Sequence, residues 1–75
     1  MKLSQPFPHS IKPVHEGVYQ TITLNRTWND YYFNYFCVEA GIWYASACDP
    51  ESAELKFKEK VPSSIQVFDW RGVLK

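Results

Sequence analysis

The sequence predicts an α+β fold, in which one short helix packs on one face of a small antiparallel sheet. Three apolar or alternating segments separated by turn residues predict a three-stranded meander. A helix start and a further alternating segment follow, so the predicted order is β-β-β-α-β. The last strand is expected at an edge of the meander, and the sequence leaves open which edge. With 75 residues, the chain has room for one domain.

Residues 1–13 are predicted to form an extended N-terminal arm, and residues 14–75 to form the domain. Prolines recur in the arm, where each removes a backbone donor and favours extended geometry in the residue before it. Phe7 and Ile11 are the apolar side chains that could anchor the arm. A free tail is the alternative.

The first two strands are expected at residues 18–24 and 31–38. After a turn at Gly17, the first segment alternates and is rich in β-branched residues. The second has apolar or aromatic residues on both faces, which favours a central strand. Residues 25–30 between them are polar and predict a loop, with Trp28 as the exception.

Residues 39–41 predict a three-residue hairpin turn, with Gly41 in the left-handed conformation. Residues 42–48 would return as the third strand. Cys37 would then lie opposite Trp43 or Tyr44, depending on the loop type.

In that register Cys48 lies beyond disulfide reach of Cys37. Two cysteines make no disulfide framework, so both thiols are expected to be reduced in an intracellular protein.

Asp49 is a suitable helix N-cap, and Pro50 fits the first helical position. The helix is expected to end before Pro62, and it must pack on the sheet because it is too short to be stable alone. Residues 65–70 alternate and predict the final strand. Residues 71–72 would end that strand, with a short apolar tail after them.

Composition bears on the class of protein. Eight Lys and Arg balance eight Asp and Glu, which counts against a dedicated nucleic-acid binder. No segment approaches the ~20 apolar residues of a membrane span, and the N-terminus has no apolar stretch of a secretory signal. A cytoplasmic location without membrane contact is therefore expected.

No catalytic residue, metal ligand or cofactor is predicted. His9, His15, Cys37 and Cys48 are possible ligands, but the two cysteines lack the close spacing of structural zinc sites. Cys48 precedes a helix N-terminus, which could activate its thiol, yet the sequence places no base beside it and Asp49 opposes the thiolate. A thiol-dependent activity is the weakest hypothesis.

Aromatic residues make up 17% of the chain. Tyr31, Phe33 and Tyr35 should project from one side of the second strand, and Tyr32 and Phe36 from the other. Because one helix covers only one side, the other side must be exposed, covered by the arm or buried against a partner.

Interface cores are enriched in Trp, Tyr, Phe and Arg, which gives a predicted set of partner-binding residues. Trp28 is expected to be the most exposed aromatic, while core packing competes as the interpretation for Trp43 and Trp70. The predicted set consists of Trp28, Tyr31, Phe33, Tyr35, Trp70 and Arg71.

Short motifs at residues 13–19, 33–36, Trp43, 50–53 and 70–74 resemble those of a group of small uncharacterised phage and prophage proteins. The resemblance implies a phage or mobile-element origin and carries over no catalytic residues. Small phage proteins that act on the host are commonly inhibitors of host proteins, including anti-defence proteins.

The first functional hypothesis is a non-enzymatic module that binds and modulates a host protein, with a homodimer as a further state. Single-stranded nucleic-acid binding through the aromatic sheet face is the alternative, which the charge balance disfavours. A self-assembling structural or virion accessory role is the third.

Overall fold

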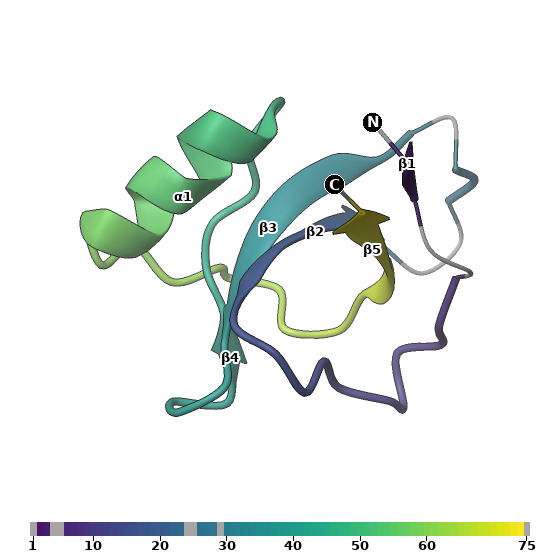
Figure 1. The fold of residues 1–75 in the computed structure, drawn as a ribbon, viewed down its shortest axis with the longest axis horizontal. Helices are drawn as coiled ribbons and strands as arrows, with labels where there is room; N and C mark the ends of the chain where they lie inside the picture. Colours follow the sequence, from purple (N-terminus) through teal and green to yellow (C-terminus); the bar gives the residue numbers. More distant parts are fainter. Residues whose placement is uncertain (1, 4–5, 24–25, 29, 75) are drawn as a thin grey trace.

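The computed structural model describes residues 2–3, 6–23, 26–28 and 30–74. It confirms the predicted α+β fold, an antiparallel sheet with one helix, and Figure 1 shows the helix on the outer side of a strongly curved sheet. The sheet order is β1-β5-β2-β3-β4, so the last strand joins the meander beside β2. The elements are β1 (Lys2–Leu3), β2 (Gly17–Ile22), β3 (Tyr32–Cys37), β4 (Ile42–Trp43), α1 (Pro50–Lys58) and β5 (Asp69–Leu74).

An aromatic cluster fills the inner side of the curved sheet. Trp43 is 1% exposed and meets Phe36 and Phe68 edge-on, at ring-centroid distances of 4.9 and 5.5 Å. Trp70 is also buried in this inner cluster, and Tyr19 packs against it. Core packing of Trp43 and Trp70 is thereby confirmed.

The helix covers the opposite face of the sheet through a small buried cluster and a ring stack. Phe33, Ala47 and Ala53 form this helix-side cluster, and Val18 packs against it. Tyr35 stacks on Phe57 of the helix with ring centroids 3.9 Å apart. The helix therefore lies on the face that carries Phe33 and Tyr35, a choice that the sequence left open.

The strand β2 runs from Gly17 to Ile22, close to its predicted bounds, and Leu24 lies outside the described residues. The turn between β3 and β4 has four residues, because Cys37 pairs with Ile42. Neither predicted partner of Cys37 is correct. Gly41 does adopt the predicted left-handed conformation, with φ of +68°.

The third strand is shorter than predicted, since regular pairing is interrupted after Trp43 and returns only as an isolated bridge between Phe33 and Ala47. The fully buried amide of Asn34 causes the break by donating to the carbonyl of Tyr44 at 2.7 Å and to the Ser46 hydroxyl at 3.0 Å. The backbone N–H of Ala45 turns instead to the carbonyl of Val61. Cys37 is buried, Cys48 is exposed, and both thiols are free.

The helix begins as predicted. The carboxylate of Asp49 accepts a hydrogen bond from the backbone N–H of Ser52 at 2.7 Å, with Pro50 in the first turn. The helix ends at Lys58, and Lys60 takes a left-handed conformation with φ of +61°.

The final strand begins at Asp69 rather than at residue 65, and it continues through residues 71–74, which were expected to lie beyond it. Gln66 explains the later start, because its side-chain amide pairs with the edge of β4. It accepts from the backbone N–H of Trp43 at 2.7 Å and donates to the carbonyl of Trp43 at 2.9 Å. This segment thus covers a strand edge before it joins the sheet.

The N-terminal arm runs along β5. Phe7 and Trp70 exchange backbone hydrogen bonds of 2.7 and 3.0 Å, and their rings stack at 4.6 Å. The indole N–H of Trp70 donates to the carbonyl of Ile11 at 2.6 Å. Earlier in the arm, β1 pairs with the end of β5.

Candidate functional site

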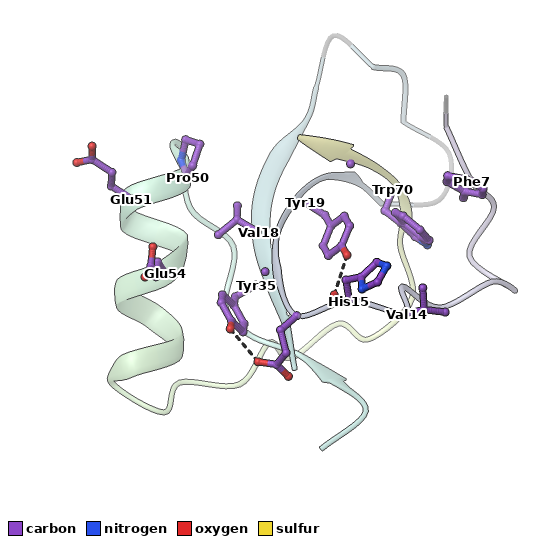
Figure 2. A pocket seen from close by; sticks show the side chains of 13 residues that line it. Phe7, Val14, His15, Val18, Tyr19, Tyr35, Pro50, Glu51, Glu54 and Trp70 are labelled. Carbon is purple, nitrogen blue, oxygen red and sulfur yellow. Dashed lines mark hydrogen bonds between the residues drawn. The ribbon is translucent and has the colours of Figure 1, made fainter. Parts of the chain in front are cut away.

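An open groove of about 950 Å³ crosses the molecule where β2 begins. Figure 2 shows the lining side chains in two groups on either side of β2, and we call the part of the groove beside the helix the helix lobe and the part beside the N-terminal arm the arm lobe. The residues that line it are Phe7, Val14, His15, Glu16, Gly17, Val18, Tyr19, Tyr35, Pro50, Glu51, Glu54, Trp70 and Gly72.

The helix lobe lies between α1 and the sheet. Its apolar walls come from Val18 and Tyr35, whose side chains point toward the helix in Figure 2, and from Pro50 at the start of the helix. The exposed carboxylates of Glu51 and Glu54 stand on its rim. This lobe therefore combines an apolar floor with negative charge.

The arm lobe is more apolar. Phe7 and Trp70 form one wall, and Tyr19 and Val14 complete it. Val14 is 76% exposed, the most exposed of the large apolar side chains on the described residues. The phenol of Tyr19 donates to the carbonyl of His15 at 2.7 Å, which holds its ring across the lobe. Burial raises the pKa of Tyr19.

Glu16 connects the two lobes and carries the third carboxylate of the groove. One oxygen accepts from the Tyr35 hydroxyl at 2.8 Å, and the other accepts from the backbone N–H of Val38 at 2.6 Å. The hydrogen bond from Tyr35 is the main reason that the pKa of Glu16 is lowered. Burial, followed by the adjacent Glu16, raises the pKa of Tyr35 to about 12. At neutral pH this pair is a carboxylate and a neutral phenol.

Gly17 follows at the first position of β2, with φ of +145°. L-amino-acid side chains rarely accept this conformation. Because a Cβ at Gly17 would meet no atom within 4 Å, backbone conformation rather than space favours glycine there.

A second surface brings together two residues of the predicted set. The Arg71 guanidinium lies over the Trp28 ring, 4.3 Å from its centroid, and its Nε donates to the Gln20 side chain at 2.5 Å. The contact leaves Trp28 half-buried, although the sequence predicts it as exposed. This pair lies outside the groove lining.

The other four residues of the predicted set do not form one surface. Tyr35 and Trp70 line opposite lobes of the groove, and Trp70 is mostly buried there. Phe33 is buried beneath the helix, so a partner cannot reach it while the helix is in place. Tyr31 packs edge-on against Phe33 and stays 44% exposed.

Sequence reasoning missed Val14, Glu16 and Tyr19 as site residues. They lie within residues 13–19, for which the sequence indicated a turn at Gly17, the start of a strand and a resemblance to phage proteins, but no binding site. These three residues line one groove because the fold places the N-terminal arm on one side of β2 and the helix on the other.

Among the described residues, no group of three or more His, Cys, Asp or Glu side chains could hold a metal ion. No helix in the described ranges is long and apolar enough to cross a membrane. Comparisons with protein-family models, curated proteins and solved structures found no match to this chain.

Proposed function

We propose that this protein is a non-enzymatic protein-binding module that uses the groove to hold a segment of a partner. The observation that carries the proposal is a groove whose apolar walls are fixed before any ligand arrives. Preorganised aromatic walls favour binding because little side-chain entropy remains to be lost. Aromatic residues in such pockets also supply much of the energy of protein interfaces.

Several contacts hold the walls in place. Trp70 is fixed by its stack on Phe7 and by its indole hydrogen bond to Ile11. Tyr35 is held between the ring of Phe57 and the carboxylate of Glu16. The Trp70 wall is thus tied to the N-terminal arm, and the Tyr35 wall is tied both to α1 and to the segment before β2.

A host protein is the proposed partner. The resemblance of residues 13–19 and 70–74 to small phage proteins supports this part of the proposal, because both segments contribute to the groove. Binding there would block or modulate the host protein in the manner of a host-takeover or anti-defence protein.

The nucleic-acid alternative receives less support. Its stacking platform requires several free rings on one face of β3, but Phe33 is buried and Tyr35 already stacks on Phe57, which leaves the exposed rings of Tyr31 and Tyr32. The groove carries the carboxylates of Glu16, Glu51 and Glu54, which repel phosphate.

Affinity capture from a bacterial lysate, with mass spectrometry of the retained proteins, tests the proposal. Wild type and two variants serve as baits. Val14→Asp changes the arm lobe, and Ile65→Asp is an equally drastic change at an exposed residue outside the groove lining. One protein retained in stoichiometric amount by wild type and Ile65→Asp, but lost with Val14→Asp, is the expected result. Equal retention by all three would contradict binding through the groove, and recovery of the protein alone would favour self-assembly.

A further inference from the structure

We infer that the groove recognises a peptide segment with a basic residue next to an apolar or aromatic anchor. The anchor occupies the arm lobe and the basic side chain lies in the helix lobe. This inference rests on the proposed function, and it specifies the chemistry of the partner.

Charge complementarity selects the basic residue. Glu16, Glu51 and Glu54 all line the groove at its helix lobe or beside it, and His15 is the one basic residue of the lining. Lys58 lies 3.8 Å from Glu54, but both side chains are largely exposed, so solvent weakens this ion pair. The lobe therefore keeps an excess of negative charge.

The positive pole of the helix does not cancel this charge. Asp49 already caps the helix by accepting from the backbone N–H and the hydroxyl of Ser52. Glu51 adds a second carboxylate in the first turn. Both complement the helix dipole, so an anionic ligand gains nothing at this end.

Glu16 keeps its charge when the groove is occupied. The hydroxyl of Tyr35 and the backbone N–H of Val38 already stabilise its ionised form. A carboxylate has capacity for further hydrogen bonds, so an incoming guanidinium or ammonium can add to these two. Glu16 thus lies where the basic side chain of the ligand would pass from one lobe to the other.

The arm lobe selects the apolar anchor. Its apolar lining consists of Phe7, Val14, Tyr19 and Trp70, with Gly72 of β5 beside Tyr19, and Figure 2 places the His15 imidazole between Tyr19 and Val14. No carboxylate from this set competes for the ligand, and the Tyr19 hydroxyl is occupied by the carbonyl of His15. An aliphatic or aromatic side chain would bury apolar surface there.

Selection from a displayed library of random twelve-residue peptides tests the inference. The 75-residue chain serves as bait in three forms: wild type, the double variant Glu51→Lys/Glu54→Lys, and Glu59→Lys. Glu59 lies just after the helix and does not line the groove, so Glu59→Lys is the control for a Glu→Lys change outside the groove. All three substituted glutamates are exposed, and the substitutions should preserve the fold.

Wild type and Glu59→Lys should enrich peptides with Arg or Lys next to an apolar residue. The double variant should lose that preference for basic residues. A synthetic peptide from the wild-type selection should bind the double variant about tenfold more weakly, since two exposed charge contacts are lost. Its affinity for wild type should also fall with added salt.

Two results would overturn the inference in different ways. Peptides enriched in acidic or purely apolar residues, with binding still lost in Val14→Asp, would refute the basic ligand and leave the proposed function standing. Failure to enrich any peptide, together with partner capture that Val14→Asp leaves unchanged, would refute both.

Discussion

The two faces of the sheet are packed in different ways. The inner cluster consists of four large buried aromatics, Phe36, Trp43, Phe68 and Trp70. The helix-side cluster contains one aromatic, Phe33, with the small side chains of Ala47 and Ala53.

The difference follows from what covers each face. On the inner side the sheet curves over its own side chains, so bulky rings are needed to fill the enclosed space (Figure 1). On the other side a separate helix must approach closely, and Ala53, with 0% exposure, allows that approach. The inner cluster therefore fills the space that the sheet encloses, whereas the helix-side cluster sets the distance between the helix and the sheet.

Removing volume from the inner cluster should have the largest effect. We expect Trp43→Ala to lower the free energy of unfolding by about 3–5 kcal/mol, because a buried ring is replaced by a cavity. A domain of this length has roughly 4–11 kcal/mol of stability in total, so the variant should be close to unfolding.

Urea denaturation followed by tryptophan fluorescence measures this loss, with Leu55→Ala at an exposed helical position as the control. A loss below about 1 kcal/mol for Trp43→Ala would show that the inner cluster does not dominate stability.

Adding volume to the helix-side cluster should be the next most damaging change. Ala53→Leu is expected to cost about 1–3 kcal/mol, since the helix must shift to accommodate the larger side chain. The same substitution at Ala40, in the exposed turn after β3, should have little effect. If urea denaturation showed Ala53→Leu to be as stable as wild type, the helix would not be held at a fixed distance.

Removing the helix cap separates helix formation from helix packing. Asp49→Ala should cost about 1 kcal/mol, because the backbone N–H of Ser52 loses its acceptor. Circular dichroism during thermal unfolding measures the change, with Glu59→Ala as the control. Equal melting temperatures for the two variants would mean that packing alone maintains the helix.

The smallest effect is expected at Glu16, on the exposed edge of the groove. Its lowered pKa means that its contribution is present above its ordinary pKa of 4.5 and is lost as pH falls through the lower folded value. Glu16→Gln should therefore flatten the decline in stability below that pH, as measured by urea denaturation at several pH values. If stability declined at low pH in Glu16→Gln as it does in wild type, the two hydrogen bonds to the Glu16 carboxylate would not contribute to stability.

Tyr35 gives the alkaline counterpart of that measurement. Its pKa is raised from 10.0 to about 12, so the stabilising neutral phenol persists below pH 10 and is lost as pH rises through about 12. Ultraviolet titration of the folded protein should show late phenol transitions for Tyr35 and for Tyr19, whose pKa burial also raises, and Tyr35→Phe should lose the transition near pH 12. If the transition near pH 12 remained in that variant, it would belong to another tyrosine.

Local signals predicted much of the fold. The cap at Asp49, the left-handed Gly41 and the alternation in β2 depend on neighbouring residues, and the structure has all three. Burial in residues 65–68 also alternates as predicted, with Phe68 buried and Val67 exposed. The segment nevertheless pairs through the Gln66 side chain rather than as a strand, which alternation alone could not reveal.

The sequence by itself determined the fold class and the positions of the main elements, because propensity, capping and periodicity act over a few residues. Tertiary structure decided which face the helix covers, where β5 begins and how the groove forms. Each of these depends on contacts between distant segments, such as Phe7 with Trp70 and Glu16 with Tyr35. Such contacts compete for the same buried surface, so they are determined only when the whole chain packs.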